Sequence, residues 1–129
     1  MNGWFLAADV LLAGAFFVHV ISGNRLYACA RPGRDNAAAC EAWLMGRCGV
    51  QLISVDLALG AVFLLLLGCG AIPRCFYLEL FLLLTYGGWS LFWLVSLACE
   101  RSAKRFYMRL CHWLLFLLLA VLCALGLAN

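Results

Sequence analysis

The stretch that decides the fold is GVQLISVDLALGAVFLLLLGCGA, residues 49–71, in which Asp56 is the only acidic, basic or histidine residue. A bilayer core of about 30 Å needs about 20 helical residues, so this run is long enough to cross one. Residues 63–67 are apolar without interruption, whereas a strand of a membrane barrel would alternate apolar and polar residues. The run therefore predicts a transmembrane helix, whose backbone groups pair within the helix.

Three more apolar blocks accompany this run, and the predicted spans are about 3–22, 49–71, 76–98 and 106–127. The chain is 67% hydrophobic and 12% charged, against about 45–50% and about 25% in soluble domains, which is too apolar for a soluble core. We predict an all-α, four-transmembrane-helix bundle forming one integral membrane domain over residues 1–129. The first block carries Asp9 and no basic residue, which favours a retained span over a cleaved signal.

The distribution of basic residues predicts the orientation. Eight of the nine Lys and Arg residues fall in the connections after the first and third spans, and only Arg74 falls on the other side. By the positive-inside rule, the basic connections face the cytosol, matrix or stroma, while both termini and the turn at 72–75 face outward. We expect a multi-pass protein of the ER or an organelle inner membrane.

The first connection, residues 23–48, is the only sizeable polar stretch. Its Pro32-Gly33 pair predicts a turn, after which Asp35 or Asn36 can cap a helix. Residues 37–45 favour helix, so we expect a short interfacial helix here or one that runs on into the second span. Trp43 suits the interface because its ring is apolar and its N–H needs a polar partner.

Ionisable residues inside apolar spans are the first candidates for function. Asp9 and Glu79 both fall toward the outer side, near Arg74. A structural ion pair, or snorkelling to the interface, is the favoured interpretation, and a proton or ion path is the alternative.

His19, Asp56 and His112 form a second group, toward the inner side of three different spans. If they converge, the two histidines could bind a metal or hold a haem between their imidazoles. A buried hydrogen-bond cluster that fixes helix register is the favoured alternative, because no local ligand motif is present. We therefore expect no cofactor, with haem as the alternative, and assign no catalytic residue.

Two helical faces carry polar side chains. In the third span, a stripe places five residues on one side, which predicts packing against another helix; its members are Glu79, Tyr86, Ser90, Trp93 and Glu100. At the start of the fourth span, Arg101, Arg105, Arg109 and His112 follow at spacings of four, four and three. Together with Arg47, this basic ladder is the candidate site for anionic lipid or another anion.

The eight cysteines include no Cys-x-x-Cys motif, and most of them are interpreted as small packing residues. A disulfide between Cys69 and Cys75, at the outer turn, is the alternative interpretation for these two residues. The basic residues follow membrane topology and do not indicate nucleic-acid binding.

Two features of the layout are similar to those of a known family: Gly23-Asn24-Arg25 at the end of the first span, and the turn at Pro73. The chain resembles the membrane-associated eicosanoid and glutathione metabolism proteins, which have four spans, outward termini and a longer inner first loop. The resemblance covers the whole chain as topology only. Where that family's arginine is followed by an Asn and an acidic residue, Arg47 is followed here by Gln51 and Ser54.

Three functional hypotheses follow. The first is a non-catalytic accessory or scaffold subunit of a larger respiratory, photosynthetic or ER membrane complex, in contact with other subunits and anionic lipid. The second, implied by the resemblance, is an enzyme or carrier for lipophilic substrates in which Arg47, Gln51, Arg105 and Arg109 hold an anionic group. The third is a haem- or metal-binding subunit that uses His19 and His112.

Overall fold

The computed structural model describes residues 1–33, 35–100 and 104–129, apart from the side chains at 105, 106 and 109. All regular elements in these ranges are helical. They are α1 (Gly3–Val18), the π-helical segment η1 (His19–Gly23), α2 (Asn24–Cys29), α3 (Ala37–Cys69), α4 (Phe76–Cys99), α5 (Lys104–Arg109) and α6 (His112–Ala128).

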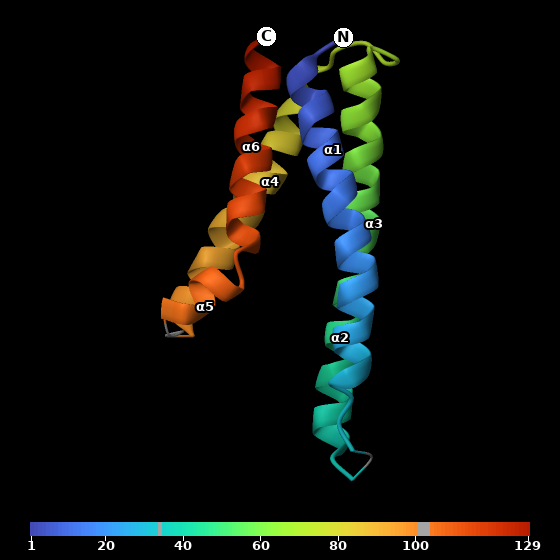
Figure 1. Cartoon of the computed structure of the whole chain (residues 1–129), viewed down its shortest axis with the longest axis vertical. Helices are drawn as coiled ribbons and strands as arrows, with labels where there is room; N and C mark the ends of the chain where they lie inside the picture. The colour runs from blue at the N-terminus through green and yellow to red at the C-terminus, as the bar shows by residue number, and fades with distance from the viewer. Residues whose placement is uncertain (34, 101–103) are drawn as a thin grey trace.

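The helices form two arms that meet at one end. In the first arm, α1, η1 and α2 run end to end alongside α3, and in the second arm α4 packs along α6. Figure 1 shows the arms joined where both chain termini and the α3–α4 turn lie, an end that we call the apex, and diverging toward the opposite end. Contacts between α1 and α6 hold the arms together.

The hydrophobic core lies in the apex half of the molecule. It consists of the first turns of α1, the second half of α3, the first half of α4 and the middle of α6. Its buried members are Phe5, Ala8, Leu12, Leu57, Leu64, Leu67, Leu82, Tyr86, Phe116, Leu119, Ala120 and Cys123. Because all four long helices contribute, this core fixes the angle at which the arms leave the apex.

Helix boundaries at the apex follow from local chemistry. Gly70 ends α3 with a φ of 73°, a left-handed conformation that glycine adopts without a Cβ penalty. The Ala71 amide then donates to the Leu66 carbonyl at 2.9 Å, which satisfies an orphan acceptor at the helix end. This compact stop turns the chain toward α4.

Three helices are long and apolar enough to cross a membrane, namely residues 3–29, 37–69 and 76–99, and α6 is a shorter apolar helix of 17 residues. Of the two arrangements predicted for the first-loop helix, the structure shows the one that runs on into the second span, because α3 continues unbroken from Ala37 through Gly46 and Gly49, and it shows no separate interfacial helix over residues 37–45. The first helical rod also extends past residue 22 to Cys29. The predicted span 106–127 is interrupted at Leu110 and Cys111, so its long apolar helix begins at His112.

Candidate functional site

The charged pair at the apex is built around Arg74, in the turn between α3 and α4. Its Nε donates to Glu79 Oε1 at 2.8 Å and its Nη2 to Glu79 Oε2 at 2.6 Å, so the pair is bidentate. The same Nη2 donates to the carbonyls of Gly126 and Leu127, at 2.9 and 3.3 Å. Hydrogen bonds to Glu79 raise the pKa of the Arg74 guanidinium, so this residue stays charged.

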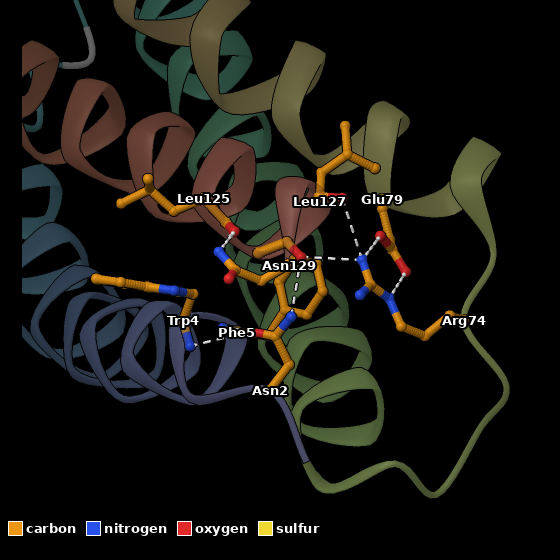
Figure 2. Close-up of polar contacts among 9 residues, drawn as sticks. Asn2, Trp4, Phe5, Arg74, Glu79, Leu125, Leu127 and Asn129 are labelled. Carbon is orange, nitrogen blue, oxygen red and sulfur yellow. Dashed lines mark hydrogen bonds and ion pairs between the residues drawn. The ribbon is translucent and has the colours of Figure 1, made fainter.

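Asn2 completes this apex junction from the N-terminal side. Its backbone N–H donates to the Gly68 carbonyl at 2.9 Å, and its Nδ2 donates to the Gly126 carbonyl at 2.9 Å. Its Oδ1 accepts from the amides of Trp4 and Phe5 and thereby caps α1. Figure 2 shows Asn2, at the start of α1, and Arg74, in the α3–α4 turn, both reaching the C-terminal turn of α6. The junction ties the ends of all four long helices.

Replacing Asn2 by alanine should lower stability more than the same change at Asn36. Each asparagine caps one helix, a role worth about 1 kcal/mol, but only Asn2 also binds a second helix through Gly126. Thermal unfolding of both variants in detergent measures the difference. Equal losses would mean that the Asn2–Gly126 hydrogen bond contributes nothing.

Of the two outer carboxylates, Glu79 is fully buried and paired, whereas Asp9 is half-buried on α1. The single ion pair among the described residues joins Arg74 to Glu79 and leaves out Asp9. The geometry at Glu79 is that of a structural ion pair linking the α3–α4 turn, α4 and α6. Asp9 is not brought to this junction.

A cleft of about 920 Å³ lies between the diverging arms. Residues of α1, η1, α2 and α3 form one wall, and residues of α4 and α6 form the other. Aromatic side chains dominate the second wall, and the polar groups include histidine, serine and tyrosine. The residues that define this arm cleft are His19, Ser22, Gly23, Tyr27, Gly49, Val50, Ile53, Trp89, Phe92, Trp93, Ser96, Glu100, His112 and Phe116, with seven other residues that are apolar or glycine.

His19 enters the cleft from the first residue of the π-helical segment. Such segments are rare and occur frequently at functional sites. The His19 Nε2 lies 3.1 Å from the Val50 carbonyl oxygen. A carbonyl only accepts, so Nε2 carries the hydrogen in this contact. The contact also fastens η1 to α3.

His112 lines the same cleft from the start of α6, and its ring packs against Trp93 at a tilt of 34° with centroids 4.8 Å apart. Trp93 in turn lies 6.4 Å from the Phe116 ring. The Trp93 Nε1 is buried and has no hydrogen-bond partner among the described residues. The Nε1 atom therefore lies inside the wall and does not open onto the cleft.

The structure brings together two of the three predicted inner residues. His19 and His112 share the arm cleft, whereas Asp56 is absent from its lining. The Asp56 Oδ2 is buried without a hydrogen-bond partner among the described residues. Within the described residues, no group of three His, Cys, Asp or Glu side chains is placed to hold a metal ion.

The predicted stripe on the third span faces inward over most of its length. Glu79, Tyr86 and Ser90 are buried, and the Ser90 hydroxyl donates to the Trp113 carbonyl of α6 at 2.9 Å. Further along, Trp93 and Glu100 line the arm cleft. The stripe thus changes from helix packing to cleft lining where the arms separate.

The predicted basic ladder is only partly described. Arg101 lies outside the described residues, and Arg105 and Arg109 are placed in α5 by their backbone alone. The break at residues 110–111 separates α5 from α6, so the ladder does not run on to His112 along one helix. Arg47 lies over the Trp43 ring, 5.6 Å from its centroid, with Arg31 at 5.5 Å.

The remaining polar predictions are placed as follows. Gln51 Nε2 donates to Asn24 Oδ1 at 2.9 Å and so links α3 to α2. Cys69 and Cys75 are free thiols, as are the other six cysteines. The sequence reasoning missed Asn2, Tyr27, Trp89 and Phe116; the Asn2-Gly3 start of an apolar block was a capping signal that could have identified the first of them.

Comparison with known proteins gives no relative for this chain. No protein-family model, no curated protein and no solved structure matches it.

Proposed function

We propose that this chain is a four-span integral membrane protein that serves as a non-catalytic subunit of a larger membrane assembly. The observation that carries the proposal is the apolar surface on the outward faces of both arms. Large hydrophobic side chains there are more than half exposed; on α3 and α4 they include Leu52, Val55, Leu59, Phe81, Leu84 and Leu91. A helix that is apolar all round needs protein or lipid around it.

In this proposal, both lipid and partner helices contact the outward faces of the arms. In hydrocarbon, helices associate by close packing and interhelical hydrogen bonds, because lipid tails are as apolar as leucine. The two arms use such packing with each other only in the apex half. The separated halves of α3 and α4 are therefore available to other subunits.

The proposal also includes α6 as the fourth membrane span and the orientation of the chain in the membrane. The α6 helix has 17 residues, about 26 Å at 1.5 Å per residue, which suits a span that begins below the headgroups. The described residues of the 30–36 connection and α5 lie at the end opposite the apex, and both segments carry basic residues in the sequence. We place that end at the cytosolic, matrix or stromal surface, where Arg47, Arg101, Arg105 and Arg109 meet anionic headgroups.

Mild detergent extraction followed by native pull-down and mass spectrometry tests the proposal. The protein should stay in the membrane fraction after lysis without detergent, and it should co-purify with other membrane subunits at a mass well above 14.2 kDa plus micelle. Recovery as a lone monodisperse monomer would overturn the subunit role. Recovery in the aqueous fraction would overturn the membrane location as well.

A further inference from the structure

We infer that Arg31, Trp43 and Arg47 form a binding site for the headgroup of one anionic phospholipid, at the end of the first arm opposite the apex. We call these three residues the arginine–tryptophan site. The site rests on the membrane location and orientation proposed above, and it is independent of the role as a subunit. Three observations support it: the fixed geometry of the side chains, the lack of a carboxylate partner, and the depth of the site in the membrane.

Trp43 holds both arginines against one ring. The guanidinium carbon of Arg31 lies 5.5 Å from the ring centroid, and that of Arg47 lies 5.6 Å from it. The ring itself is fixed, because its Nε1 donates to the Tyr27 carbonyl of α2 at 2.8 Å. Cation–π contacts at this distance stabilise a guanidinium. Both positive charges are therefore held in place before a ligand arrives.

Local structure brings Arg31 back to α3 although it precedes that helix. The Cys40 thiol, in the first turns of α3, donates to the Gly33 carbonyl at 3.4 Å and so holds the connection against the helix. On the side of α2, Tyr27 packs on Gly46, where an added Cβ would lie 2.8 Å from its hydroxyl. The arginine–tryptophan site is thus built where the 30–36 connection, α2 and α3 meet.

Neither arginine of the site is paired with a carboxylate of the described residues, which include all six Asp and Glu side chains of the chain. The single ion pair among them is the one between Arg74 and Glu79 at the apex. The two guanidinium groups of the site lie within about 11 Å of each other, because each is within 5.6 Å of the same centroid, and like charges at this separation repel. An anion bound beside them removes that repulsion.

The site lies at the depth of the inner headgroups. Along α3, Arg47 is about 33 Å and Trp43 about 39 Å from Cys69 at the apex end, at 1.5 Å per residue. A tilt of about 20° reduces these heights to about 31 and 37 Å. With the apex at the outer boundary of a hydrocarbon core about 30 Å thick, both residues fall in the inner headgroup layer. Lipid phosphates occupy this layer, which favours a lipid over an acidic protein segment as the ligand.

The chemistry of the site selects an anionic headgroup over a zwitterionic one. A guanidinium donates two parallel hydrogen bonds to the oxygens of a phosphate. Phosphatidylglycerol offers this phosphate without a cation attached to it. Phosphatidylcholine would bring its ammonium group next to the two positive charges held at Trp43, which disfavours its binding.

The test is native mass spectrometry of the full chain, released from nanodiscs that contain phosphatidylcholine and phosphatidylglycerol in a four-to-one ratio. We expect one phosphatidylglycerol to stay bound per chain, enriched about fivefold or more over its share of the bilayer. Arg47→Gln should remove most of this enrichment, because it deletes one of the two guanidinium groups. The matched control is Arg25→Gln, which removes the same charge from an exposed arginine of α2 outside the site and should keep the enrichment.

A second variant keeps the proposal falsifiable if Arg47→Gln fails to fold. Arg31 is exposed in the connection before α3 and belongs to no helix, so Arg31→Gln leaves the helices intact and should also lose most of the enrichment.

Four results would overturn the site. A parent chain without enrichment has no such site, and an equal loss in Arg25→Gln would mean that the whole basic surface attracts the lipid. Displacement of the lipid by inorganic phosphate would assign the site to a free anion. An acidic chain that co-purifies with the parent and is lost in Arg47→Gln, with lipid enrichment unchanged, would assign it to a protein partner. None of these results would move the parent out of the membrane fraction or make it a lone monomer, so they are distinguishable from failure of the proposed function.

Discussion

Replacing Arg74 by glutamine should lower the midpoint of thermal unfolding by on the order of 10 °C. The reason lies in its partner. The Glu79 side chain is only 2% exposed, and Arg74 supplies both of its bidentate hydrogen bonds. Removing one member of a buried ion pair leaves the other member charged and without compensation.

The same substitution also releases α6. Arg74 donates to two carbonyls in the last turn of that helix, so the variant loses its link between the α3–α4 turn and the C-terminus. The loss should appear first as faster hydrogen exchange in α6, because this helix is held at the apex by Arg74 and Asn2 together. Circular dichroism melts and exchange mass spectrometry measure the two effects.

Two further variants separate the ion pair from general charge effects. Arg25→Gln makes the same change at an exposed arginine of α2 and should leave the midpoint nearly unchanged. The double variant Arg74→Gln/Glu79→Gln should recover part of the loss, because two amides carry no buried charge and can still hydrogen-bond. A double variant less stable than Arg74→Gln would contradict the account based on a stranded carboxylate.

Long apolar runs are predictable from the sequence because their signal is cumulative. Residues 49–71 and 76–98 carry so few polar groups that helix is the remaining backbone solution in an apolar environment, and the structure makes both of them helical, in α3 and α4. Glu79 and Arg74 were also predictable as neighbours, since a five-residue separation across a helix start places their side chains near each other.

The arm cleft was not predictable, because apolar side chains look alike whichever surface they face. Leu97 lines the cleft and Leu91 lies exposed on the outward face of the same helix, yet nothing in composition separates them. The π-helical segment was not predictable either, since residues His19–Gly23 contain no proline or charged residue that would indicate a change of helical pitch. His19 and His112 were found as candidates only because ionisable residues are rare in apolar runs.

The second large effect is expected at Gly60, where Tyr86 of the second arm packs directly against α3. A Cβ added there would overlap the Tyr86 hydroxyl and lie 3.0 Å from Leu12 Cδ2. Tyr86 is 1% exposed and Leu12 fully buried, so neither side chain has free space to move into. Gly60→Ala should therefore cost about 1–3 kcal/mol of stability through overpacking.

Alanine at Gly49 is the matched control on the same helix. No atom lies within 4 Å of a Cβ built there, so Gly49→Ala should gain up to about 1 kcal/mol from its higher helix propensity. Opposite signs for one substitution at two positions of α3 would identify packing, and not glycine content, as the cause. Thermal unfolding in the same detergent supplies both values.

Tyr86→Phe decides whether the hydroxyl is the atom in conflict. Phenylalanine removes only the group that a Cβ at Gly60 would overlap, so the double variant Gly60→Ala/Tyr86→Phe should recover most of the stability lost in Gly60→Ala. This coupling matters beyond stability, because Gly60 on α3 and Tyr86 on α4 join the arms immediately below the cleft. If Gly60→Ala forces the arms apart there, the cleft should widen, and Tyr86→Phe should restore its width. An uncoupled double variant would mean that the arms are held at a different point.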